Sequence, residues 1–312
     1  MKNLCDKSFL LTAIALLSFF SPLLAQTTPE EFKALHWDKS FQGRQLDLSR
    51  YKPTFIDHFD KMDITAEGGT GPWFAPGHST FGAGKFLPPG TNGPFFIQNG
   101  NLILRADKTV NPDGNFKWTA ACMQTVDPTT GHGFAQQYGY FEMKAKFPSG
   151  TGGWPALWLL SQNGYLDKTK PRGEIDIVEW YGGDAKGIHT TGHIWPAAER
   201  KPEDPVQKEI GSGLYTNIGS LLKDGKLEGF HTYGAELTPE WVIYYFDRQE
   251  VGRFPMVPEW RTPFYMLVDL AIFDEQAWES QGPKEMTVEY VMAYALDSTI
   301  PEKVTPSPVR KR

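Results

Sequence analysis

The run Tyr138-Gly-Tyr-Phe-Glu-Met-Lys-Ala-Lys-Phe147 alternates apolar and charged side chains through its second half. In an extended strand, successive side chains point to opposite faces, so Phe141 and Met143 would lie on one face and Glu142 on the other. Such alternation is typical of an antiparallel sheet that has one face on a core and the other in water. We therefore predict a half-buried antiparallel strand at this position.

Further short runs rich in β-branched and aromatic residues recur along the chain. They lie at 101–106, 241–247, 264–272 and 286–294, each bounded by Gly, Pro, Asn or Asp. Runs of this length between turn residues predict strands, and helical periodicity is scarce. The absence of a repeat of about 20 to 50 residues argues against solenoids and propellers. We predict an all-β domain, a β-sandwich, over residues 49–298, preceded by an N-terminal extension at 26–48 and followed by a C-terminal tail at 299–312.

The overall charge limits the classes of partner. The chain has 312 residues, of which 31 are basic and 37 acidic, and its formal net charge is −6. A net-acidic chain argues against nucleic acid or an anionic membrane as the main partner. Its 10 Trp residues offer amphipathic ring faces on which flat ligands can stack. We expect no nucleic-acid partner.

Residues 1–25 have the pattern of a secretory signal peptide. After a basic start, an apolar run from Phe9 to Ala25 contains Pro22 near its end, and polar sequence follows. At about 17 residues this run is short for a membrane span. We expect cleavage after Ala25, a secreted or periplasmic protein, and no membrane attachment thereafter. Loss of Cys5 would leave Cys122 alone, so the mature chain could form no internal disulfide.

The segment Gly173-Glu-Ile-Asp-Ile-Val-Glu-Trp180 carries three carboxylates, although acidic residues are depleted in strands. Glu174 and Asp176 would share one face of a strand. Strict alternation would place Glu179 on the other face. One extra residue, a β-bulge at 177–178, returns Glu179 to the face of the first two carboxylates.

With this bulge, the two glutamates have a catalytic spacing. Four effective strand steps separate their Cα atoms by roughly 13 Å, and an inward lean of the side chains brings the carboxyl groups about 5 to 6 Å apart. This spacing is typical of retaining glycosidases, whereas inverting enzymes need roughly 6.5 to 9.5 Å. Like charges on one face raise at least one pKa, which leaves a protonated acid beside an ionised partner. Four nearby tryptophans would supply aromatic walls for a sugar: Trp154, Trp158, Trp180 and Trp195.

Several other familiar sites are absent from the sequence, which contains no HExxH, GxSxG or CxxC motif. His189 and His193 could share one face of a strand, but no third metal ligand follows at a suitable spacing. The pair therefore assigns no metal site.

The acidic segment at 173–180 and the strand-like runs along the chain together resemble family-16 glycoside hydrolases of the laminarinase and lichenase type. Glu174-Ile-Asp-Ile-Val-Glu179 is similar to the bulged active-site signature E-x-D-x-x-E of that family. Other similar runs follow in the family's order, at 55–60, 99–105, 138–144, 153–159, 188–193, 230–241 and 286–294. The resemblance implies a concanavalin A-like β-sandwich jelly roll, with two curved antiparallel sheets and a cleft on the concave face. It also implies an endo-acting β-glycan hydrolase.

The resemblance further implies roles for individual residues. Glu174 would be the nucleophile, Glu179 the general acid/base, and Asp176 would hydrogen-bond the nucleophile and tune its charge. The expected substrate-binding residues that match cleft positions are Glu142, Trp154, Trp158, Trp180, His189 and His193. A polysaccharide is the expected partner, the protein is expected to be a monomer, and catalysis requires no cofactor. Many members bind a structural calcium near the last strand, and the resemblance leaves open whether this chain has such a calcium site.

Two positions depart from the commonest pattern of the family. Asp269 stands where laminarinase-like members usually carry Asn, and Arg172 stands where mixed-linkage glucanases tend to have an aromatic residue. We include both among the expected substrate contacts. An Arg at the edge of a cleft could meet an anionic or sulfated sugar.

The acidic, Trp-rich cleft favours a neutral polymer, because the CH faces of glucose stack on indole and need no counter-charge. We predict β-1,3-glucan or mixed β-1,3/1,4-glucan as the substrate. Linkage choice depends on loops such as 74–94 and 194–215, so other activities stay open. They are hydrolysis of a galactan (agarose, carrageenan or porphyran) or of a bacterial exopolysaccharide, transglycosylation, and carbohydrate binding without catalysis.

Overall fold

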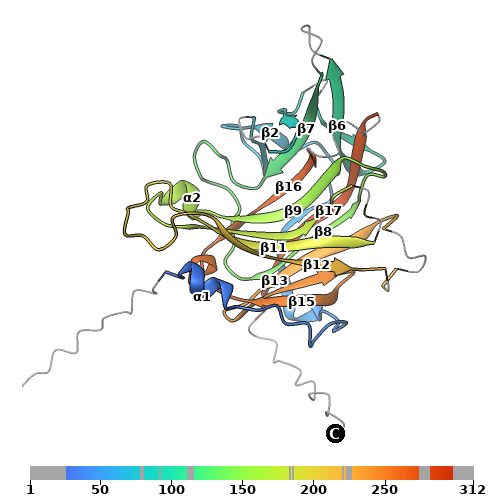
Figure 1. Cartoon of the computed structure of the whole chain (residues 1–312). Helices are drawn as coiled ribbons and strands as arrows, with labels where there is room; N and C mark the ends of the chain where they lie inside the picture. Colours follow the sequence, from blue (N-terminus) through green and yellow to red (C-terminus); the bar gives the residue numbers. More distant parts are fainter. Residues whose placement is uncertain are drawn as a thin grey trace, which may run out of the picture.

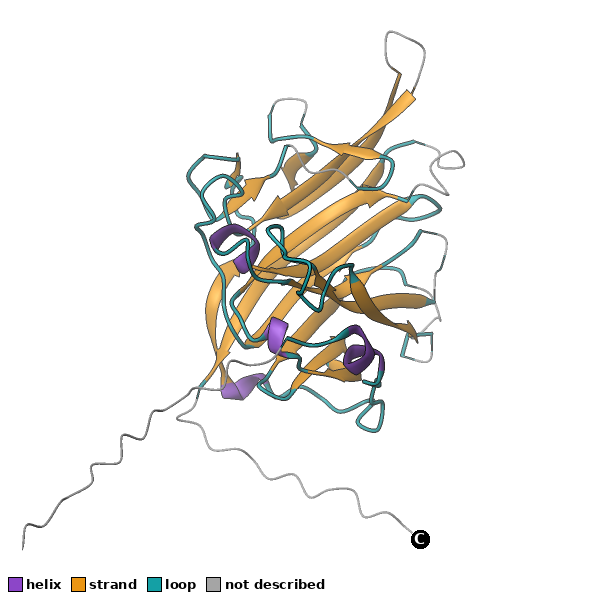
Figure 2. Cartoon of the chain, turned by 60° about the vertical axis from the view of Figure 1, so that its left-hand side comes forward, coloured by secondary structure: helices purple, strands orange, loops and turns teal. Residues whose placement is uncertain are grey.

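The computed structural model describes residues 26–297 apart from 78–80, 91–92, 111–115, 183, 185, 220, 223–226 and 274–281. The predicted signal peptide and C-terminal tail therefore lie outside the described residues. Within them, no helix is both long enough and apolar enough to cross a membrane. Figures 1 and 2 show long, curved strands with a few short helices at the periphery. The prediction of an all-β domain is confirmed.

The strands form two layers, here called sheet A and sheet B. Sheet A contains β1 (Tyr51–Asp57), β5 (Phe95–Gln98), β6 (Asn101–Val110), β8 (Gly139–Lys146), β13 (His231–Leu237), β14 (Trp241–Phe246), β15 (Gln249–Pro255) and β17 (Lys284–Leu296). Its central path runs β6–β17–β8–β13–β14–β15, and all of these neighbours are antiparallel.

Sheet B contains β2 (Ile64–Ala66), β3 (Trp73–Ala75), β7 (Phe116–Gln124), β9 (Gly153–Ser161), β10 (Arg172–Glu179), β11 (Gly187–Trp195), β12 (Ile210–Asn217) and β16 (Phe264–Ile272). Its central path, β7–β16–β9–β10–β11–β12, is antiparallel throughout. The short strand β4 (Gly84–Phe86) pairs in parallel with β7, and the antiparallel β6–β7 pair connects the two sheets. The helical elements are α1 (Pro29–Lys33), η1 (Leu48–Arg50), α2 (Asn163–Leu166) and η2 (Pro258–Trp260).

The main core lies between the sheets and explains the alternation in β8. Phe141 and Met143 of β8 are buried in the same cluster as Leu159 of β9 and Ile175 of β10. The prediction of a half-buried strand is wrong at Glu142, whose side chain is also fully buried. The outer face of β8 is covered by tyrosine side chains, so this part of sheet A has both faces out of water.

The predicted N-terminal extension packs against sheet A and η2. Phe32 of α1 is buried against Phe254 and Trp260, with ring centroids 5.5 and 5.9 Å away. Farther along, Asp38 forms an isolated β-bridge with Arg253 of β15. These contacts cover an edge strand, which would otherwise offer unpaired backbone groups to another chain.

Candidate active site

The segment with the three carboxylates contains the predicted β-bulge. Both ladders of β10 shift register after Asp176. In the ladder with β9, Asp176 pairs with Trp158 and Val178 pairs with Leu157, although Trp158 and Leu157 are consecutive residues. One residue of β10 is therefore extra, and Ile177 and Val178 are both buried in the main core. The bulge turns the later carboxylate back to the face of the first two, as the spacing of the motif predicts.

The three carboxylates of β10 line one pocket of about 300 Å³ on the face of sheet B that points away from the core. The lining residues are Phe81, Trp154, Ala156, Trp158, Glu174, Asp176, Glu179, Trp195 and Asp269. Apolar walls around a few convergent polar groups are typical of small-molecule and sugar sites. Acidic groups and indole rings can therefore act on the same sugar ring.

Glu179 is held by two side-chain donors. The Trp154 indole Nε1–H donates to Glu179 Oε1 over 3.0 Å, and the Tyr181 hydroxyl donates to the same oxygen over 2.9 Å. Both bonds end on Oε1, so neither occupies Oε2. The carboxyl group is thus oriented, and one of its oxygens is left to other contacts.

Glu174 is held by one indole donor, because Trp195 Nε1–H donates to Glu174 Oε2 over 2.9 Å. Trp195 lies on β11, which pairs directly with β10. The predicted aromatic wall therefore includes a residue that orients a carboxylate, although Trp195 was not among the expected substrate contacts.

Asp176 pairs with a histidine from the neighbouring strand. His193 Nε2 lies 3.2 Å from Asp176 Oδ2, and His193 Nδ1 lies 2.6 Å from Glu209 Oε1. Burial opposes the charged imidazole, but the hydrogen bonds to the two carboxylates outweigh it and raise the pKa of His193 to about 9. At neutral pH, His193 is therefore a cation beside the acidic pocket, which it contacts through Asp176 without lining it.

Burial raises the pKa of each of the three carboxyl groups. Together with the charge of Asp176, it raises the pKa of Glu174 to about 8, and it raises the pKa of Asp176 to about 6. It also raises the pKa of Glu179, against hydrogen bonds from Tyr181 and Trp154 that lower it. At neutral pH, the three groups therefore do not all ionise. The charge of His193 lowers the pKa of all three.

Possible ligand atoms of Glu174, Asp176 and His193 all lie within 4.8 Å of one another. A cation could in principle bind such a group, because carboxylates and imidazole are metal ligands. The ion pair between His193 and Asp176 accounts for the same proximity, so we assign no metal here.

Asp269 orients a wall of the pocket. Trp158 Nε1–H donates to Asp269 Oδ1 over 2.7 Å, and the backbone N–H of Ala271 donates to Oδ2 over 3.1 Å. Burial raises the pKa of Asp269 well above its usual range. Its exposed fraction is 0 %, so the structure connects the residue to the pocket chiefly through Trp158.

Two expected substrate contacts lie elsewhere, and their predicted role is wrong. Glu142 is in sheet A, where it accepts hydrogen bonds from Arg248, Tyr140 and Tyr290 over 2.7 to 2.9 Å. Trp180 is only 4 % exposed and belongs to the main core. It follows the bulged segment, and its indole N–H donates to the carbonyl of Asp184 instead of reaching the pocket.

His189 and Arg172 lie near the pocket without lining it. His189 pairs across the ladder with Glu179, and its ring lies between those of Tyr181 and Tyr215, at 4.9 and 5.1 Å. Burial lowers the pKa of His189. Arg172 begins β10 and lines an adjoining pocket that also contains Trp158.

Sequence reasoning missed Tyr181 and Phe81. Tyr181 is two residues after Glu179, and the period of a strand would have placed both on one face. Phe81 comes from the loop before β4 and packs its ring 5.4 Å from Trp154 and 5.8 Å from Trp158. No local pattern distinguishes this phenylalanine from others in the chain, because only the tertiary fold brings its loop over β9.

Residues 90–292 match the model of glycosyl hydrolases family 16. The chain is 31% identical over 300 residues to endo-1,3-1,4-beta-glycanase ExsH of Rhizobium meliloti (strain 1021), a match that covers 89% of this chain and 58% of that protein. It is 32% identical over 275 residues to endo-1,3-1,4-beta-glycanase EglC of the same strain, covering 81% and 54%. The chain thus spans about half the length of the curated relatives it matches.

The fold is similar to that of the laminarinase catalytic domain from Thermotoga maritima MSB8, with a TM-score of 0.57 and 23% identity. That match covers 78% of this chain and 98% of the solved one. The family model spans most of sheet A and sheet B, including the bulged strand with its three carboxylates. The chain belongs to glycosyl hydrolases family 16.

Proposed function

We propose that this protein is an endo-acting β-glucanase that cleaves internal bonds of β-1,3-glucan or mixed β-1,3/1,4-glucan. The observation that carries the proposal is the placement of Glu174 and Glu179 on one face of a bulged strand, within an aromatic-walled pocket. The names of the two Rhizobium meliloti relatives, both endo-1,3-1,4-beta-glycanases, point to the same class of substrate.

The proposed chemistry is retaining double displacement. Glu174 attacks the anomeric carbon while Glu179 protonates the departing glycosidic oxygen, which gives a covalent glycosyl-enzyme. Glu179 then removes a proton from water, and the water displaces Glu174. The hydrogen bonds from Trp195 to Glu174, and from Trp154 and Tyr181 to Glu179, support this proposal because they orient both carboxyl groups.

The family signature assigns the role of nucleophile to Glu174 and that of general acid/base to Glu179. Burial and the charge of Asp176 raise the pKa of Glu174 to about 8, which favours its protonated form at neutral pH. The nucleophile must be ionised, which means that the cluster has to redistribute its protons when substrate binds. His193 favours the ionised form of each carboxyl group and so lowers the cost of this redistribution.

A neutral sugar suits the catalytic pocket better than a charged one. Four carboxyl side chains line it, from Glu174, Asp176, Glu179 and Asp269, and those that are ionised would repel a sulfate or carboxylate. Trp154, Trp158 and Trp195 offer faces or edges to the apolar side of a pyranose ring. A binding role without catalysis would not require both glutamates to be held by dedicated donors.

The test is a panel of polysaccharides of equal mass: laminarin, lichenan, agarose and κ-carrageenan, with products identified by mass. We expect internal cleavage of laminarin or lichenan, and none by Glu174→Gln. Cleavage of agarose or carrageenan with both glucans untouched would overturn the substrate assignment. Binding of glucan with no cleavage by the wild type would favour a carbohydrate-binding protein.

We also propose that the protein acts outside the cytoplasm as a monomer, with residues 1–25 removed. The basic start, the short apolar run and the polar sequence from Gln26 support export. N-terminal sequencing of protein from the medium and from the periplasm would test this, and retention of Met1 in both would contradict it.

A further inference from the structure

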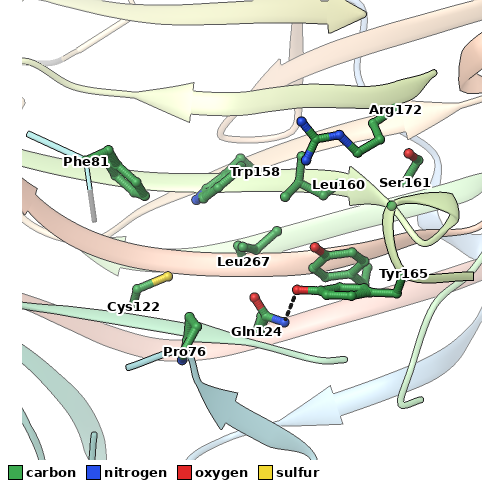
Figure 3. A pocket seen from close by; sticks show the side chains of 12 residues that line it. Pro76, Phe81, Cys122, Gln124, Trp158, Leu160, Ser161, Tyr165, Arg172 and Leu267 are labelled. Carbon is green, nitrogen blue, oxygen red and sulfur yellow. Dashed lines mark hydrogen bonds between the residues drawn. The ribbon is translucent and has the colours of Figure 1, made fainter. Parts of the chain in front are cut away.

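A second pocket, of about 210 Å³, adjoins the catalytic pocket and shares Phe81 and Trp158 with it. It extends across sheet B toward β16 and β7, where Tyr265 and Gln124 line it, and α2 contributes Tyr165. Figure 3 shows Gln124 and Tyr165 among the side chains that line this pocket, and the Gln124 amide donates a hydrogen bond of 3.2 Å to the Tyr165 hydroxyl. Its volume leaves room for a charged substituent and part of its sugar.

The two pockets differ sharply in charge. The catalytic pocket is lined by four carboxyl groups, whereas Arg172 is the one ionised side chain among the residues that line the second pocket. Cys122 and Tyr265 are neutral there, because burial raises the pKa of both groups. An anionic group would therefore be attracted to the second pocket, whereas the ionised carboxylates of the first would repel it.

Arg172 has hydrogen-bonding capacity to spare. Its Nε atom is buried and has no hydrogen-bond partner among the described residues, and the guanidinium forms no ion pair with them. In Figure 3 the guanidinium is turned over Leu160 toward Trp158, the wall that the two pockets share. A buried donor without a partner is costly, and the planar fork of an arginine matches the oxygens of a carboxylate or sulfate.

We propose that the Arg172 pocket binds an anionic oxygen substituent, a carboxylate or a sulfate ester, on the sugar unit next to the one in the catalytic pocket. The proposal builds on the glucanase function only for the identity of the backbone. The contrast in charge would also set the register of the polymer: an unsubstituted unit sits over the carboxylates, and the acidic unit sits beside Trp158. A substituted glucan should then be cut at a fixed distance from its charged units.

The first experiment measures binding of small probes, and it requires no catalysis. Glucose, glucuronate and glucose 6-sulfate are titrated into the wild type by calorimetry at low salt. We expect glucuronate or glucose 6-sulfate to bind more tightly than glucose, and the comparison between them distinguishes carboxylate from sulfate. Arg172→Gln should lose this preference, by on the order of tenfold or more, because a hydrogen-bonded charge pair is lost.

Two further variants guard against a folding defect and a general charge effect. A Cβ on Gly164 would lie 2.9 Å from Arg172 Cδ, so Gly164→Ala should displace the guanidinium while its charge is kept. It should weaken binding of the anionic probe in the same direction as Arg172→Gln. Lys168 is exposed and lies outside the pocket, so Lys168→Gln removes the same charge and should leave the preference unchanged.

The second experiment compares cleavage of laminarin with that of carboxymethylated and sulfated laminarin. The readout is the ratio of kcat/KM for the charged over the neutral polymer, together with the position of charged units in the products. Arg172→Gln should lower this ratio by on the order of ten- to a hundredfold. Lys168→Gln should keep it.

The two experiments separate the pocket from the glucanase function. If glucuronate and glucose 6-sulfate bind no better than glucose while laminarin is cleaved, the pocket proposal is overturned and the function stands. If the anionic probes bind through Arg172 but no glucan is cleaved, the pocket stands and the glucan backbone is wrong. An equal loss of charged and neutral cleavage in Arg172→Gln, with probe binding unchanged, would show a structural role and overturn the proposal.

Discussion

His193 Nε2 lies 3.2 Å from Asp176 Oδ2, which places a cation inside a cluster of three carboxyl groups on β10. The two residues are on paired strands, and the second nitrogen of His193 contacts Glu209. This relationship affects the titration of the whole pocket, because the charge of His193 lowers the pKa of all three carboxyl groups.

Removal of this cation should move the pH dependence of activity. In His193→Gln the three carboxyl groups lose a positive neighbour, so their pKa values rise further. The nucleophile then ionises at higher pH and the acid loses its proton at higher pH, so both limbs of the kcat/KM profile should shift upward. His231→Gln, which removes a histidine paired with Asp247 in sheet A, is the matched control. Identical profiles for His193→Gln and the wild type would show that the cation does not tune the site.

The nucleophile can be tested by chemical rescue. Glu174→Ala should reduce turnover by on the order of 10⁴-fold or more, because the covalent step is lost. Azide should restore part of the activity and yield a glycosyl azide, because the small anion fits the space of the missing carboxylate. Glu240→Ala, at an exposed turn of sheet A, should behave like the wild type. Rescue of Glu179→Ala but not of Glu174→Ala on the same activated substrate would exchange the two roles.

The acid/base role of Glu179 depends on the leaving group. Glu179→Ala should slow hydrolysis of the natural glucan by about 10² to 10⁴-fold, the usual contribution of general acid catalysis. An aryl glycoside whose leaving group needs no protonation should form the glycosyl-enzyme almost as fast as with the wild type. Burst kinetics on the two substrates measures this difference. Equal losses on both would argue against Glu179 as the acid.

The stereochemical outcome reports the separation of the carboxyl groups. A separation of about 5 to 6 Å leads to a glycosyl-enzyme and net retention, whereas a wider gap admits water and leads to inversion. Proton NMR of the first-formed product should show the β-anomer before mutarotation. An initial α-anomer would refute the proposed nucleophilic role of Glu174.

Glu142 should matter for stability and not for catalysis. Glu142→Ala removes the partner of Arg248, which is 39 % exposed, and two buried hydrogen-bond acceptors for Tyr140 and Tyr290. We expect the free energy of unfolding in urea to fall by about 2 to 3 kcal/mol. The kcat/KM of the folded variant should stay within about twofold of the wild type. A raised KM with unchanged unfolding would instead place Glu142 in contact with substrate.

The spacing of Glu174, Asp176 and Glu179 was sufficient to predict the bulge and the shared face of the three carboxylates. The two-residue period of a strand, and the change of face that one extra residue causes, are local properties of the backbone. Both are therefore visible in eight consecutive residues. The all-β architecture followed from similar local patterns. The same two-residue period, extended past Glu179, would also have placed Tyr181 on the face of the carboxylates.

Other positions depended on which sheet a strand joins and on what covers it. Glu142 alternates with apolar residues as an exposed residue would, yet tyrosines and Arg248 cover it in sheet A. Trp180 follows the catalytic motif directly but points into the core. Phe81 reaches the pocket from a loop more than 70 residues before β9.

The sequence by itself therefore determined the class of fold, the bulged strand with its three carboxylates and the family, because each is encoded in local periodicity or in a contiguous motif. Only the tertiary structure decided which aromatic residues orient the two glutamates, where His193 finds its partners, and that Arg172 faces a separate pocket without a carboxylate. These features arise from contacts between strands and loops far apart in the chain. Burial and charge at each position depend on those neighbours, which no stretch of sequence specifies alone.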